Sequence, residues 1–309
     1  MGLARNILLA MSTNAWLREK ATKAAFVRRS VSKFMPGETV DDAIAAAKIE
    51  EAQGIDTIFT KLGENVSSEA EARGVMDHYL EVLDKVHAAG LHTQISVKPT
   101  QLGLDLDEEL SFRLTEAIVK RAEQTGNFVW IDMESSPYVD RTIAQYRRLR
   151  EGSRIVGICL QAYLYRTEKD IEDLIPGGAA VRLVKGAYLE PADVAFPKKA
   201  DVDENYFKLC CRLMSDEAQS LGAVLHMGTH DPVLAGRLNA WADQHKVPRT
   251  AYEFAMLYGI QRGLQLRLNQ DQRRLRVLIA YGEYWFPWYM RRLAERPANV
   301  GFVIKNLFS

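Results

Sequence analysis

Short apolar runs alternate with longer amphipathic segments along most of the chain. Several of these runs are almost continuously apolar, which is typical of parallel strands that are covered on both faces. Segments with helical spacing follow them, as over 107–124, 203–220 and 284–296. The expected strands lie at 55–61, 92–97, 127–132, 154–160, 179–184, 222–227, 249–254 and 275–281.

Eight strand-helix units in one chain predict a closed (β/α)₈ barrel of the TIM type. The alternative is a doubly wound open sheet, but no G-x-G-x-x-G follows a strand and no P-loop motif occurs. Residues 1–50 are expected to form an N-terminal helical extension, and residues 51–309 the barrel, in a single structural unit. Within the extension, Thr39 followed by Asp42 is typical of a helix start.

Composition narrows the class of protein. Lys plus Arg and Asp plus Glu number 40 each, so no net charge favours nucleic acid. Three cysteines without metal-ligand spacing indicate a reducing compartment. The apolar run at residues 7–11 is too short to span a bilayer, and a cytoplasmic protein is expected.

Polar side chains follow most of the expected strands, at the end where barrel enzymes carry their chemistry. This set is rich in cations, and buried cations need an anionic partner such as a phosphate or a carboxylate. A metal site built from His226, His230, Asp132 and Glu134 is the alternative, but their spacing matches no ligand motif and no metal is expected. The polar residues are Glu64, Lys98, Asp132, Glu134, Gln161, Arg182, Lys185, Thr229, His230 and Tyr281.

The last expected helix carries a second set of charges. Arg291 and Glu295 lie one turn apart, and Arg292 is rotated by about 100° from Arg291. Two guanidinium groups placed in this way can bind one carboxylate. A basic surface helix with an ordinary ion pair is the equally open alternative.

Several motifs together resemble the proline dehydrogenase family, in its short bacterial form that carries one activity. The resemblance runs in order from the N-terminal helices to Asn306. Its fragments are Phe34–Thr39, Leu62–Val66, Asp132–Ser135, Val181–Tyr188, Gly228–Asp231 and Arg291–Glu295.

The resemblance implies a distorted (β/α)₈ barrel that binds FAD. It implies that Arg182 lies near the flavin N5 and that Lys185, Gly186 and Ala187 meet the flavin and its phosphates. Gln161 would bind the isoalloxazine, Met133 would pack beside it, and Thr229 and His230 would hold the pyrophosphate and adenosine.

The resemblance also implies a site for proline. Lys98, Arg291 and Arg292 would bind the substrate carboxylate, and Asp132 would support Lys98. Glu64 would pair with Arg291 as a gate, and Glu295 would belong to the same site. Proline would be oxidised to 1-pyrroline-5-carboxylate by hydride transfer to flavin N5, with electrons passed to a quinone at the membrane surface.

Three positions depart from the family pattern: Thr60 stands where relatives often carry Asp, Ala255 stands where they often carry Gln, and Leu278 is the third. Where relatives carry a tyrosine beside the substrate ring, this chain has Leu278, and Tyr281 is the neighbouring alternative. Oxidation of 4-hydroxyproline or another cyclic imino acid therefore stays open. So do a lyase that uses Lys98 or Lys185 as a Schiff-base nucleophile and a flavin-binding sensor.

Overall fold

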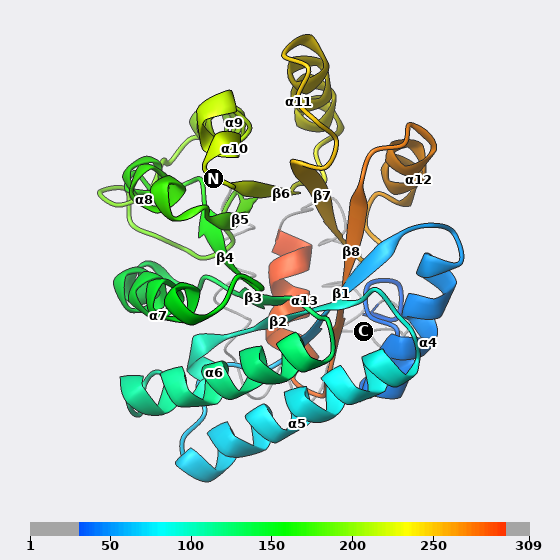
Figure 1. The fold of residues 1–309 in the computed structure, drawn as a ribbon, viewed down its shortest axis with the longest axis vertical. Helices are drawn as coiled ribbons and strands as arrows, with labels where there is room; N and C mark the ends of the chain where they lie inside the picture. Colours follow the sequence, from blue (N-terminus) through cyan, green and yellow to red (C-terminus); the bar gives the residue numbers. More distant parts are fainter. Residues whose placement is uncertain (1–30, 295–309) are drawn as a thin grey trace, which may run out of the picture.

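The computed structural model describes residues 31–294, without the side chains of residues 291–294. Within this part of the chain, eight parallel strands close into a barrel in sequence order, and β8 pairs with β1. Figure 1 shows the helices arranged around the strands, with α13 projected onto the centre of the ring. The predicted (β/α)₈ barrel is therefore confirmed.

Every observed strand overlaps its predicted range. The largest offset is at β7, which begins at Tyr252 instead of residue 249 because Ala251 N–H bonds back to the Pro248 carbonyl and closes a turn. The strands are β1 (Asp56–Lys61), β2 (Gln94–Val97), β3 (Val129–Ile131), β4 (Val156–Gln161), β5 (Ala180–Val184), β6 (Val224–Gly228), β7 (Tyr252–Leu257) and β8 (Leu275–Tyr281).

The helix predicted over 203–220 is wrong in one respect, because two helices occupy this region. Ser215 caps a new helix by accepting a hydrogen bond from Ala218 N–H, which ends the run of α9. The helices and 3₁₀ turns are α4 (Val40–Glu51), α5 (Glu69–Ala88), η1 (Pro99–Leu102), α6 (Glu108–Gln124), η2 (Ser136–Tyr138), α7 (Val139–Gly152), α8 (Thr167–Leu174), η3 (Ile175–Gly177), α9 (Lys199–Leu213), α10 (Asp216–Ser220), α11 (Pro232–Gln244), α12 (Arg262–Gln270) and α13 (Trp285–Ala294).

The start of α4 confirms the predicted capping motif. The Thr39 hydroxyl accepts from Asp42 N–H at 3.1 Å, and the Asp42 carboxylate accepts from Thr39 N–H at 3.0 Å. This helix packs against β1 and β8, so the chain before the barrel joins the outer layer. The division at residue 50 stays a prediction, since residues 1–30 lie outside the described part.

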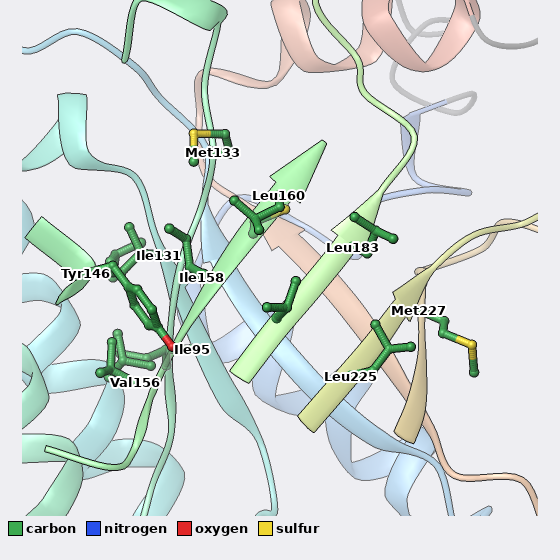
Figure 2. Close-up of a cluster of buried hydrophobic side chains, with 14 of the residues drawn as sticks. Ile95, Ile131, Met133, Tyr146, Val156, Ile158, Leu160, Leu183, Leu225 and Met227 are labelled. Atoms are coloured by element: carbon green, nitrogen blue, oxygen red, sulfur yellow. The ribbon is translucent and has the colours of Figure 1, made fainter. Parts of the chain in front are cut away.

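The main core lies between the strands and the surrounding helices. Alternate residues of each strand point outward into this layer, as Ile158 and Leu160 of β4 do beside Ile131 (Figure 2). The other alternate residues point into the barrel, where the polar groups described below are found. No helix in residues 31–294 is long and apolar enough to cross a membrane.

Candidate active site

A buried ion pair crosses the interior of the barrel. Arg182 of β5 is only 3% exposed, and its guanidinium pairs with Asp132, which follows β3. Ser96 of β2 lies between them: its hydroxyl donates to Asp132 Oδ1 at 2.8 Å and accepts from Arg182 Nη2 at 2.9 Å. Because β2 and β5 are not neighbours in the barrel, these side chains can meet only through its interior.

Arg182 stays charged but is incompletely bonded. Burial alone would lower its pKa, yet the Asp132 carboxylate and the Cys159 sulfur raise the pKa above its usual value. The second terminal nitrogen, Nη1, is buried and has no hydrogen-bond partner in the described structure. The Trp130 ring lies on one side, 5.4 Å from the guanidinium carbon. A donor held in this way is available to a bound acceptor.

Lys98 directly follows the second strand, as predicted, and lies in the same part of the barrel. It is largely buried, and its ammonium donates to the Lys61 carbonyl at 3.3 Å. Gln101 donates to the same carbonyl at 3.3 Å. The predicted support of Lys98 by Asp132 stays a prediction, because the described hydrogen bonds of Asp132 go to Ser96 and Arg182.

Glu134 and Gln161 connect the third and fourth strands at their carboxyl ends. Gln161 Nε2 donates to the Glu134 carbonyl at 2.7 Å, while the buried Gln161 Oε1 has no partner in the described structure. Burial raises the pKa of the Glu134 carboxyl to about 7, even though hydrogen bonds from Thr100 and the charge of Lys98 act to lower it. The site therefore holds a carboxyl group that titrates near neutrality.

A second group of charges lies after β5 and β6. Lys185 contacts Asp203 at 2.6 Å and Asp231 at 3.1 Å, and Asp231 also caps the N-terminus of α11. Next to Lys185, Gly186 has a φ of +117°, and a Cβ there would lie 2.3 Å from the Tyr163 ring. The loop that continues to Ala187 can thus follow this path only with glycine at 186.

Thr229 and His230 follow β6, as the sequence predicted. The buried Thr229 hydroxyl accepts from Asp231 N–H at 3.2 Å. His230 Nε2 accepts from Leu257 N–H at 2.8 Å, so the proton of a neutral imidazole lies on Nδ1. Their roles toward a cofactor stay predictions.

The two candidates for the position beside the substrate ring, Leu278 and Tyr281, lie on opposite faces of the eighth strand. Leu278 packs in the barrel interior with Ile58, Trp130 and Ala180. Tyr281 lies on the opposite face of the strand, is 1% exposed and bonds to His78 of α5 at 2.8 Å. The prediction of Tyr281 beside the substrate is wrong, because strand alternation continues to the end of β8 and directs this ring outward.

The remaining predicted residues are placed in part. Met133 packs in the outer apolar cluster near Leu160 (Figure 2), and its contact with a cofactor stays a prediction. Glu64 lies in the loop between β1 and α5, where its charge acts on Glu134. The side chains of Arg291 and Arg292, and all of Glu295, lie outside the described residues.

The four residues that were considered as metal ligands are not gathered. His226 lies in the barrel interior at 3.3 Å from Glu253, and burial lowers its pKa well below the usual value. His230 instead binds the backbone of β7. Among residues 31–294, no group of three or more His, Cys, Asp or Glu side chains could hold a metal ion.

Comparison with known proteins agrees with this arrangement. The model of the family described as proline dehydrogenase matches residues 43–305. The chain is 36% identical over 283 residues to "Proline dehydrogenase" of Deinococcus radiodurans, covering 89% of each chain. It is 35% identical over 306 residues to "Proline dehydrogenase 1" of Bacillus subtilis, covering 99% of each. The chain belongs to the proline dehydrogenase family.

Solved structures support the same barrel. A proline utilization A protein from Bdellovibrio bacteriovorus, described as inactivated by N-propargylglycine, matches with a TM-score of 0.80 and 23% identity. The match covers 89% of this chain and 33% of that one, so this proline dehydrogenase family member spans about a third of the larger protein. The predicted resemblance of this chain to the short members of the family is confirmed by its matches over nearly the whole length of two such relatives.

Three buried residues near the site were not predicted from sequence. Ser96 lies two positions before Lys98, so strand alternation could have placed it on the same face. Trp130 lies two positions before Asp132 and could have been found in the same way. Tyr79 of α5 had no such signal: its hydroxyl accepts from Lys61 N–H and donates to the Ser96 carbonyl, which links β1 to β2.

Proposed function

We propose that this protein oxidises L-proline to 1-pyrroline-5-carboxylate with FAD as the bound oxidant. The observation that carries the proposal is the buried Arg182 guanidinium with its free Nη1 in the interior of the barrel. A cation held there by Asp132 and Ser96 suits an electron-rich acceptor such as the flavin edge. Family membership supplies the reaction.

The residues present fit a flavin nucleotide. Arg182 Nη1 and Gln161 Oε1 are buried polar atoms without partners, one a donor and one an acceptor, as isoalloxazine requires. Gly186 lets the loop after β5 pass directly against the Tyr163 ring, and Lys185 would be the cation for a phosphate. Bound FAD would supply the hydride acceptor N5, an oxidising power that no protein side chain has.

The substrate site is proposed around Lys98. Its ammonium would bind the proline carboxylate together with Arg291 and Arg292, and Glu64 would pair with Arg291 as a gate over the substrate. Such a clamp fixes the carbon that loses hydride without placing an anion beside the ring nitrogen, which must be unprotonated. Loss of hydride leaves a C=N bond, and the nitrogen proton goes to solvent.

The electron acceptor is proposed to be a quinone, reached by transient contact of a cytoplasmic protein with the inner membrane surface. Family membership alone supports this step.

Leu278 favours an unsubstituted ring, since it packs with apolar residues and cannot donate to a ring hydroxyl.

The test is anaerobic mixing of the FAD-saturated protein with L-proline and then with trans-4-hydroxy-L-proline, while the visible spectrum is recorded. Bleaching by proline is expected. Bleaching only by hydroxyproline would move the specificity to the substituted ring. A protein that takes up no flavin would refute the proposal, and a borohydride-trapped adduct on Lys98 or Lys185 would favour the lyase.

Lys98→Met tests the substrate site. A charge-assisted hydrogen bond contributes about 1.5–3 kcal/mol, so half-bleaching should need at least ~10-fold more proline. Lys120→Met is the matched control, since Lys120 pairs with Glu116 on the exposed face of α6. Equal proline requirements in the two variants would remove Lys98 from the substrate site.

A further inference from the structure

Glu134 is a buried carboxylate with no role in the function proposed above. It directly follows Met133, is 3% exposed, and accepts two hydrogen bonds from a single residue, Thr100. Thr100 N–H reaches Oε2 at 3.0 Å, and the Thr100 hydroxyl reaches Oε1 at 2.6 Å. Two donors from one residue hold that residue in both position and orientation.

Thr100 in turn connects two loops of the site. Its hydroxyl oxygen also accepts from Asn65 N–H at 3.3 Å, and its carbonyl accepts from Val66 N–H at 3.4 Å. Glu134 and Thr100 therefore connect the loop after β1 to the segment after β2 and the end of β3. Gln161 of β4 joins the same assembly through the Glu134 carbonyl.

The two loops carry the residues expected to handle the substrate. Lys98 lies two residues before Thr100, and Glu64 lies one residue before Asn65. Gly63 and Asn65, which flank Glu64, have positive φ values of 141° and 50°, so this turn needs contacts from elsewhere to define it. The Asn65 amide finds one of these contacts in Thr100.

We propose that Glu134 is a positioning residue, which through Thr100 fixes the segment that carries Lys98 and the turn that carries Glu64. The inference rests on the proposed function, because it assigns these two loops to the substrate. Ionised Glu134 accepts both hydrogen bonds from Thr100. In the protonated carboxyl both bonds lose the charge of their acceptor, so both are weakened.

Glu134 changes between these two forms near neutral pH. The titratable and charged groups that act on it are Lys98, Glu64 and Tyr138. Burial is the largest effect on its pKa and raises it to about 7, while the hydrogen bonds from Thr100 lower it. Positioning should thus strengthen as the pH rises through 7 and weaken as the pH falls through it.

The test measures binding of tetrahydrofuran-2-carboxylate, in which oxygen replaces the proline nitrogen and no amine can titrate. Calorimetric titration of the FAD-saturated protein between pH 5.5 and 8.5 should give an affinity that decreases about threefold or more below an inflection near pH 7. Glu134→Gln should bind about tenfold more weakly at pH 8 and lack the inflection, since Gln cannot ionise.

Thr100→Val supplies a second variant should Glu134→Gln fold poorly. It removes the hydroxyl donor, so the affinity at pH 8 should decrease and the inflection should move to higher pH. Thr142→Val on α7 is the matched control, because this buried hydroxyl has no hydrogen-bond partner in the described structure. Its affinity and pH profile should equal those of the wild type.

Each other outcome contradicts a specific claim. A wild type that is bleached by proline but binds the analogue equally from pH 5.5 to 8.5 refutes the positioning role alone. An affinity for the analogue that increases below pH 7 also refutes the positioning role, because it would mean that Glu134 acts only by repelling the carboxylate of the analogue. A wild type that is not bleached by proline and does not bind the analogue refutes the proposed function as well.

Discussion

Replacing Asp132 by Asn should destabilise the protein measurably, because the change leaves the Arg182 charge buried without its counterion. Asn keeps the shape and an acceptor oxygen, so the variant isolates the effect of charge. Removing one partner of a buried ion pair costs roughly 3–5 kcal/mol in free energy of unfolding. Here the Asp132 side chain is 18% exposed, and Ser96 still accepts a hydrogen bond from Arg182. The free energy of unfolding should therefore decrease by a smaller amount, about 2–3 kcal/mol.

The expected change in melting temperature follows from the size of the chain. With an unfolding entropy of about 2.1 cal/mol/K per residue, a chain of 309 residues should melt roughly 3–5 °C lower. Thermal unfolding should be followed without added FAD, since a ligand that binds only the folded state would raise the melting temperature by itself.

A matched control is the pair of Arg237 and Glu204 on the surface. Its guanidinium and carboxylate share two hydrogen bonds, but Glu204 is 64% exposed. Glu204→Gln should leave the melting temperature unchanged. If Asp132→Asn melts at the wild-type temperature, or if Glu204→Gln causes an equal decrease, the reasoning from burial is refuted.

Three further changes test other parts of the structure. Gly186→Ala should lower FAD affinity and melting temperature, because the new Cβ would lie 2.3 Å from the Tyr163 ring and φ at this position is +117°. Gly236→Ala on α11 is the control and should lower neither, since no atom lies within 4 Å of its Cβ. Equal FAD binding by the two variants would contradict the contact between residue 186 and Tyr163. Tyr281→Phe should cost about 1 kcal/mol in stability and leave proline oxidation unchanged, since the hydroxyl bonds outward to His78; an altered KM would restore Tyr281 to the site. Burial, helped by Lys61, lowers the pKa of His78 to about 4, so the stability it contributes is complete above pH 6.5 and is lost as the pH falls toward 4. Between pH 7.5 and 4.5, the free energy of unfolding measured in urea should decrease by about 1–2 kcal/mol more in the wild type than in His78→Gln. Equal decreases would exclude His78 as the cause of the lower stability in acid.

The fold could be predicted almost entirely from local patterns. Apolar runs located all eight strands, and the Thr39–Asp42 motif located the start of α4. The errors were also local in origin. Ser215, which caps a second helix, interrupts a pattern that otherwise has helical spacing, and the turn before β7 delays that strand.

The site could be predicted only in outline. Barrel geometry brings the carboxyl ends of the strands together, so Lys98, Asp132, Arg182 and Lys185 could be assigned to one end from their positions. Their pairing could not be predicted. Asp132 was expected to support Lys98, yet its described hydrogen bonds go to Ser96 and Arg182, the latter 50 residues away in the chain.

The sequence by itself determined which residues alternate between the two faces of each strand, and therefore that Leu278 and Tyr281, three positions apart, lie on opposite faces of β8. Alternation is a property of the extended backbone and needs no distant partner. Only the tertiary structure decided that Arg182 meets Ser96, 86 residues earlier, that Tyr79 joins β1 to β2, and that Glu134 holds Thr100. These contacts depend on the closure of the barrel, which sets distances between strands that no local pattern records.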